Sequence, residues 1–173
     1  MAAGTTYKPI ATTTLGSAAS SVTFSSISGS YTDLVLVSNV KITTAGFGLI
    51  LQFNSSTSGY SLTDLYGDGT TAGSARATSQ SHITLTYNVG IPTASNTFGT
   101  VITNIMNYSN STTFKTVLSR YSNGSTSNGP GTEAIVGCWR DASAINSITV
   151  KQNTGSNNLD TGSTFTLYGI AAA

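Results

Sequence analysis

The sequence predicts an all-β protein: a single-domain, two-sheet antiparallel β-sandwich of jelly-roll type with a short extended N-terminal arm. Strand-like runs follow one another at intervals of about 8–15 residues, with turn residues between them. No segment shows the i, i+3, i+4, i+7 apolar spacing of an amphipathic helix. The 173 residues suffice for one hydrophobic core. Many short strands around one core are typical of a sandwich or a barrel.

Residues 1–14 are expected to form the extended arm, and residues 15–173 the sandwich domain. Pro9 fixes its own φ angle and disfavours the helical conformation at Lys8. The β-branched residues 12–14 favour an extended chain as well. We therefore expect an arm that reaches a neighbouring surface, over residues 5–14.

The first half of the domain contains four strand-like runs. The cleanest alternation is His82–Val89, in which Ile83 and Leu85 share one face with Tyr87 and Val89. Thr84, Thr86 and Asn88 would then form the opposite face. The other three runs are residues 21–24, 31–39 and 47–54.

The second half reads as a hairpin, a loop and three closing strands. Residues 99–108 and 114–120 flank a short polar turn and are expected to pair. Residues 123–131 combine glycines with a proline and predict a loop. The closing strands are expected at residues 134–140, 145–152 and 164–170.

The composition argues against catalysis and against nucleic-acid binding. Charged residues make up only 8% of the chain, its net charge is +1, and roughly a third of its residues are Ser or Thr. Its basic residues are scattered, whereas phosphate capture needs them clustered. His82 is the only histidine and is expected to point to solvent or an interface. The acidic residues lie in or beside turns. We therefore predict no enzyme, no catalytic residue and no cofactor.

Two further features have ordinary explanations. Cys138 is the only cysteine, so no internal disulfide can form, and its apolar neighbours predict a small buried side chain. Residues 66–69 place Asp68 between glycines, but the full calcium-loop pattern is absent, so we predict a tight turn and no metal site.

The sequence shows no signal peptide and no run of about 20 apolar residues. We expect folding in a cytoplasm and no membrane insertion. Few side chains titrate near pH 7, which predicts a weak pH dependence of stability.

Six runs follow one another in order along nearly the whole chain: Thr14–Phe24, Tyr31–Val37, Leu51–Asn54, Tyr66–Thr70, Ile145–Val150 and Gly162–Ile170. Together they resemble the small structural proteins of tailed bacteriophages, those of cyanophages in particular. The resemblance implies a jelly-roll-like sandwich, a homotrimer and the absence of catalytic residues. Members of this family serve as capsid decoration (cement) proteins, as tail or fibre components and as other virion proteins.

The function expected from this resemblance is a virion protein, made in the host cytoplasm and exposed on the particle, that trimerises and clamps neighbouring capsid subunits. Its partners would be copies of itself and the major capsid protein or a tail protein. A tail fibre normally has a long shaft ahead of its tip domain. We expect a short arm and no shaft here, which favours a protein that docks on an existing capsid lattice. The residues expected to contact partners are Tyr7, Pro9, Ile10, Trp139, Tyr168 and Ile170.

Two alternatives fit the same composition. One is a tail-fibre or tail-tip head that binds host surface glycans through tyrosines, Trp139 and polar loops; the other is a carbohydrate-binding module. Which face of the strand around Trp139 belongs to the core is left open by the alternation. Phe165 and Leu167 are expected to face inward, with Tyr168 and Ile170 on the other face.

Overall fold

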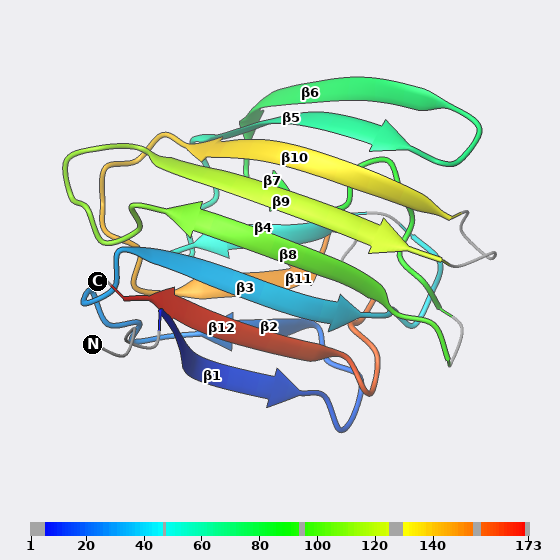
Figure 1. The fold of residues 1–173 in the computed structure, drawn as a ribbon, viewed down its shortest axis with the longest axis horizontal. Coiled ribbons are helices and arrows are strands. Elements are labelled where there is room, and N and C mark those ends of the chain that lie inside the picture. Colours follow the sequence, from blue (N-terminus) through cyan, green and yellow to red (C-terminus); the bar gives the residue numbers. More distant parts are fainter. Residues whose placement is uncertain (1–5, 47, 94–95, 125–129, 154–156, 172–173) are drawn as a thin grey trace.

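The structure is a computed structural model that describes residues 6–46, 48–93, 96–124, 130–153 and 157–171. These residues form twelve strands in two antiparallel sheets, which confirms the predicted β-sandwich (Figure 1). The strands are β1 (Tyr7–Thr14), β2 (Ser21–Phe24), β3 (Asp33–Val40), β4 (Leu49–Phe53), β5 (Tyr60–Gly67), β6 (Ala72–Gln80), β7 (Ile83–Thr84), β8 (Gly99–Met106), β9 (Lys115–Asn123), β10 (Gly131–Trp139), β11 (Ile148–Gln152) and β12 (Thr164–Ile170).

The large sheet has the order β1-β12-β3-β8-β9-β10-β5-β6, and the small sheet has the order β2-β11-β4-β7. In Figure 1 the large sheet lies in front of the small one. Without β5, β6, β9 and β10, each sheet keeps four strands, and the chain passes repeatedly from one sheet to the other. That is the arrangement of a jelly roll.

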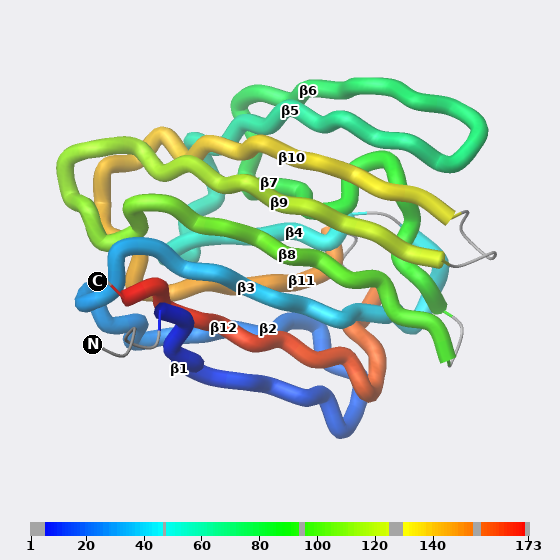
Figure 2. The backbone as a smooth tube through the Cα atoms, viewed as in Figure 1, coloured from blue at the N-terminus to red at the C-terminus, as the bar shows by residue number. Residues whose placement is uncertain are grey.

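The hairpin β5–β6 and the pair β9–β10 therefore extend one sheet of an eight-stranded frame. Figure 2 shows them side by side at the top of the molecule, away from the two chain ends. The small sheet ends at β7, and the segment after β7 covers the inner face of the added strands. Tyr121 of β9, for example, donates a hydrogen bond to the Gly90 carbonyl at 2.8 Å.

The core lies between the sheets and is built by strand alternation. β9 and β10 bury every second residue, whereas all five residues of β4 are buried, on both faces of the strand. Phe165 and Leu167 of β12 point into the core, and Tyr168 and Ile170 lie on the other face, as expected. No helix in the described parts of the chain is long and apolar enough to span a membrane.

Several predicted strands match the structure. The runs 21–24 and 164–170 coincide with β2 and β12, and β8 and β9 pair as the predicted hairpin. Residue 47, in the run 47–54, and residues 125–129, in the loop 123–131, lie outside the described residues.

The predicted strand His82–Val89 is wrong beyond its first residues, because β7 comprises only Ile83 and Thr84. Thr86 is fully buried and its hydroxyl accepts the N–H groups of Gly48 and Leu49 (3.2 and 2.9 Å). The next three backbone N–H groups bind a carboxylate instead of a neighbouring strand. His82 was expected at the surface or an interface, but it is only 9% exposed.

Strands β5 and β6 were not anticipated. β6 has the sequence AGSARATSQ, which contains no large apolar side chain, and none of its residues is fully buried. An edge strand needs only one neighbour, and β5 supplies it along the whole of β6. β6 therefore forms without the apolar alternation that identifies a buried strand.

The N-terminal segment predicted as an arm is extended, but β1 pairs along its length with β12 of the same chain. The two chain ends lie side by side, because the N–H of Ala171 donates to the carbonyl of Thr6 at 2.9 Å. Most of β1 is exposed, since it is an edge strand. Residues 1–5, including Thr5 of the predicted arm, lie outside the described residues.

Candidate functional site

The outer face of the large sheet is the candidate interaction surface. Side chains alternate across each strand, so cross-strand partners share a face. One row across this face connects Pro9, Tyr168 and Val35 at one edge with Val136 and Thr63 at the other. Apolar side chains recur along such rows, and two regions stand out.

The first region, here called the edge patch, comprises Tyr7, Pro9, Tyr168 and Ile170. Tyr7 pairs with Ile170, and Pro9 with Tyr168, on the same face of β1 and β12. The rings of Tyr7 and Tyr168 meet edge to face with their centroids 6.3 Å apart, and Tyr7 is 55% exposed. The structure thus gathers four of the six predicted partner-binding residues in one patch without a charged member, and Asp33 of β3 pairs with Ile170 at its border.

The other two predicted residues lie elsewhere. Ile10 sits at an irregularity in the β1–β12 register and packs partly against the core. Trp139 is 1% exposed, so no ring face is free for a sugar or a partner. Its ring stacks on Tyr60 (5.9 Å between centroids, planes 15° apart) and contacts Phe53 at 5.6 Å. Trp139 is therefore a core residue, and the face of β10 that carries Trp139, Gly137 and Ile135 is the face that belongs to the core.

Burial also controls the chemistry of this aromatic cluster. The Tyr60 hydroxyl accepts the backbone N–H of Phe53 at 2.9 Å. Burial of this hydroxyl raises its pKa to about 12, because the phenolate would lose its hydration. Tyr60 is accordingly a neutral structural side chain.

The second region, here called the outer groove, is a hollow of about 820 Å³ over β8, β9, β10, β5 and β6. A smaller hollow of about 430 Å³ continues it along β5 and β10. The larger part is lined by side chains that include Leu65, Ala72, Ile102, Arg120, Thr132 and Ala134. The smaller part includes Thr63, Arg76 and Val136.

Two guanidinium groups border the outer groove. Neither Arg120 nor Arg76 has a hydrogen-bond or ion-pair partner among the described residues. Glu133 belongs to the lining, but its carboxylate points to the opposite face of the sheet, where backbone N–H groups bind it. The groove is therefore positively charged and carries no compensating acid on its own face.

The buried acid pair Asp64 and Glu133 lies on the inner face of the same strands. Glu133 accepts the N–H groups of Tyr87 (3.1 Å), Asn88 and Val89 (2.9 Å). Asp64 accepts the Asn88 side-chain amide at 2.7 Å. Desolvation raises the pKa of Glu133 to about 7, and burial also raises the pKa of Asp64. This pair fastens the 87–89 segment to β5 and β10.

The other four carboxylates also bind groups of their own chain, two of them close in sequence and two of them distant. Asp33 accepts the N–H of Asn107 (2.6 Å), and Asp68 accepts the N–H groups of Thr70 and Thr71 (2.9 and 2.6 Å). Asp68 thus closes the predicted turn, and these hydrogen bonds lower its pKa. Asp141 caps Ser143 in the same way, at 2.7 Å.

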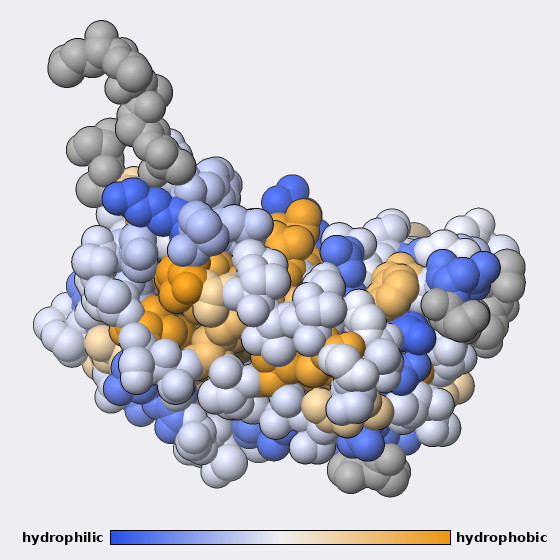
Figure 3. Space-filling view, turned by 90° about the horizontal axis from the view of Figure 1, so that it is seen from below, coloured by the Kyte–Doolittle hydropathy of each residue, from blue (hydrophilic) through white to orange (hydrophobic). Residues whose placement is uncertain are grey.

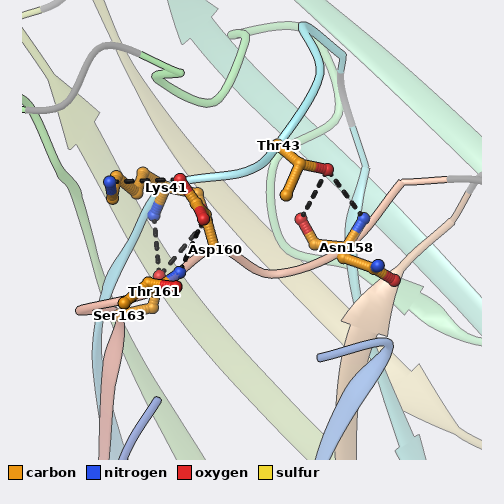
Figure 4. Close-up of polar contacts among 6 residues, drawn as sticks. All are labelled: Lys41, Thr43, Asn158, Asp160, Thr161 and Ser163. Atoms are coloured by element: carbon orange, nitrogen blue, oxygen red, sulfur yellow. Dashed lines mark hydrogen bonds and ion pairs between the residues drawn. The ribbon is translucent and has the colours of Figure 1, made fainter. Parts of the chain in front are cut away.

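Asp160 forms an ion pair with Lys41, at 3.1 Å between Oδ2 and Nζ (Figure 4). The hydrogen bond from Lys41 lowers the pKa of Asp160. Ser163 accepts the Lys41 N–H at 3.1 Å, and Thr43 and Asn158 bind each other beside this pair. Together these contacts join the end of β3 to the loop before β12, which is a structural role.

The remaining reactive groups do not form a catalytic arrangement in the described residues. His82 Nδ1 lies 2.9 Å from the Ser81 hydroxyl, and burial lowers the pKa of its imidazole. Cys138 is partly exposed on the outer face, not buried as expected. No three His, Cys, Asp or Glu side chains gather as a metal site in the part of the chain that the structure describes.

Sequence reasoning missed Arg120, Arg76 and Leu65, because their neighbourhood depends on strand register. Leu65 is 61% exposed although it lies in a strand. The sequence signal that could have located it is the alternation of Tyr60, Leu62 and Asp64, which assigns Leu65 to the opposite face.

No family model matches the chain, and no curated protein matches its sequence.

Proposed function

We propose that the protein is a non-enzymatic structural protein of a tailed-bacteriophage virion, a trimeric decoration protein that clamps neighbouring capsid subunits. The resemblance of six sequence runs to such proteins supports it, and so does the jelly-roll sandwich. The observation that carries the proposal is the edge patch, in which four predicted contact residues without charge form one surface that is exposed at β1 and partly exposed at β12.

A role without catalysis is supported by the use of the carboxylates. Each of the six binds backbone or side-chain groups of its own chain, as in Glu133, Asp64 and Asp160. Their hydrogen bonds connect loops to strands. These side chains therefore serve to stabilise a rigid shell.

The edge patch is suited to contact with a second copy of the chain. Pro9 has no N–H to donate, and the register shift beside it interrupts the edge of β1, so a further strand cannot add there easily. Association then uses the side-chain face. The net charge of +1 gives little repulsion between copies.

Figure 3 views the molecule from the side on which β1 and β2 lie, and it shows apolar surface between polar side chains. Apolar surface at this edge of the molecule adds to the edge patch as a surface for contact with a neighbour. In a three-fold ring, each subunit would offer this edge to its neighbour. The ring as a whole would then bridge the capsid subunits beneath it.

The test is an assembly measurement on purified protein and on particles that lack it. Ile170→Asp places a charge in the edge patch, and Tyr7→Ser removes an exposed ring. We expect the wild type to be a trimer by light scattering and to bind the particles saturably, because apolar contact excludes water. Both variants should be monomeric and bind poorly.

Tyr87→Ser is the matched control, because Tyr87 is also exposed (38%) but lies on the loop after β7. This variant should assemble like the wild type. A monomeric wild type that does not bind particles, or an Ile170→Asp variant that still assembles, would refute the proposal.

A further inference from the structure

We propose that the outer groove binds an acidic polysaccharide, with Arg120 and Arg76 binding carboxylates on successive parts of one chain. This site lies apart from the edge patch, and the inference does not depend on the proposed function. It rests on the shape of the groove, on its charge and on the side chains that flank it.

The groove lies on strands that the jelly-roll frame does not require. β5, β6, β9 and β10 are additions to one sheet, and four of the five strands under the groove come from them. Their inner face is occupied by core contacts and by the buried acid pair. Their outer face has no partner in the chain and is available to a ligand.

Small side chains make the surface hollow. The row Arg120–Ala134–Leu65 places an alanine between two long side chains. The adjacent row Thr132–Gly67–Ala72 contains no side chain larger than threonine. The result is an elongated depression between Leu65 and Arg120, continued past Val136 toward Arg76.

The charge of the groove selects an anion. Arg120 and Arg76 lie three strands apart, which is about 14 Å across the sheet. Neither has a partner among the described residues, and no acidic side chain lies on this face of the groove. A guanidinium group binds a carboxylate in a two-pronged geometry. Two copies of the chain face to face would instead bring four guanidinium groups together, so a second copy is disfavoured.

The flanking residues favour a sugar polymer over other polyanions. Thr100, Ser122 and Thr132 form a hydroxyl row beside Arg120, able to donate to and accept from sugar hydroxyls. Leu65 and Ile102 offer aliphatic surface to the C–H faces of the rings.

An acidic peptide and a single-stranded nucleic acid fit less well. The backbone groups of β8, β9, β10 and β5 pair with strands on both sides, so an extended peptide lying over these strands would find few partners for its own N–H groups. Only β6, at the side of the groove, has an edge without a neighbouring strand. Nucleobases need aromatic platforms. The tyrosines of the lining, Tyr66 and Tyr121, lie on the opposite face by alternation, and Tyr121 is 2% exposed.

The experiment is calorimetric titration of the full chain with oligogalacturonate. The matched ligand is the methyl ester of the same oligomer, which keeps the sugar backbone and removes the charge. We expect saturable binding to the acid form that weakens with salt, and no binding to the ester. Arg120→Gln should weaken binding about tenfold or more, because it removes a charge-assisted hydrogen bond.

Three further variants locate the site. Arg76→Gln should weaken binding too, and Ala134→Phe should block the groove without changing the charge. Lys8→Gln, an equal change of charge on β1, should bind like the wild type. Because Arg120 and Ala134 lie on the outer face, the variants should unfold at nearly the same temperature as the wild type. If a variant does not fold, the site is located on the wild type instead: the amide chemical shifts of the groove residues should change when the acid oligomer is added.

Four results would overturn the inference. The first is a wild type that does not bind the acid oligomer, and the second is a wild type that binds the methyl ester equally well. The third is that Lys8→Gln weakens binding as much as Arg120→Gln does. The fourth is that poly-glutamate or single-stranded DNA binds more tightly than the acid oligomer. The last would assign the groove to a peptide or to a nucleic acid. None of these results bears on the edge patch, so the proposed function is tested separately.

Discussion

Trp139→Ala is expected to lower the free energy of unfolding by about 3–5 kcal/mol. The ring is 1% exposed and packs on Tyr60 and Phe53, so its removal leaves a cavity between the two sheets. The loss would leave little of the stability that a domain of this size usually has. Trp139→Phe should lose less, because it keeps part of the stacking.

The measurement is urea unfolding followed by far-ultraviolet circular dichroism, since Trp139 is the only tryptophan. Val136→Ala is the control: it lies on the same strand but is 52% exposed, and should change stability by less than about 1 kcal/mol. If Trp139→Ala cost no more than Val136→Ala, the assignment of Trp139 to the core would be wrong.

The second large effect is expected at Glu133. Glu133→Ala leaves the N–H groups of Tyr87, Asn88 and Val89 without their acceptor, and should cost about 3 kcal/mol or more. Thr132→Ala, the neighbouring change on the exposed face, should have little effect. Amide hydrogen exchange should be faster at residues 87–89 in Glu133→Ala but not in Thr132→Ala.

Glu133 also gives stability a pH dependence that the composition did not suggest. Its pKa rises from 4.5 to about 7 on folding, so the native state keeps a proton that the unfolded chain has lost. This contribution is fully present below pH 4.5 and is lost as the pH rises through about 7. It corresponds to about 3 kcal/mol, and the raised pKa of Asp64 acts in the same direction.

His82 acts in the opposite direction, because a lowered pKa removes stability as the pH falls. We expect the acid pair to dominate, so the wild type should be more stable at pH 5 than at pH 8. Glu133→Gln cannot lose the proton and should flatten this difference. A wild type that is more stable at pH 8 would contradict the assigned role of Glu133.

The sequence predicts the frame of the fold because the frame depends on local alternation. The run 164–170 alternates apolar and polar residues between turn residues, and it is β12. The run 82–89 alternates equally well, but its N–H groups bind Glu133, which is 44 or more residues away. Local periodicity contains no information about such a distant acceptor, so the strand prediction fails there.

The candidate sites differ in the same way. Tyr168 and Ile170 follow from alternation in one strand, and their placement with Tyr7 and Pro9 needs only the pairing of β1 with β12. The outer groove needs the register of four added strands, one of which, β6, contains no large apolar side chain by which it could be recognised. Trp139 could not be placed because its strand is apolar on both faces.

The most direct test of the proposed function is the copy number of the protein in purified particles of the phage that the proposal expects to encode it. Quantitative mass spectrometry against the major capsid protein gives this number. A decoration protein should be present in numbers comparable to those of the capsid lattice sites. Numbers typical of a tail component, or absence from the particle, would contradict the account.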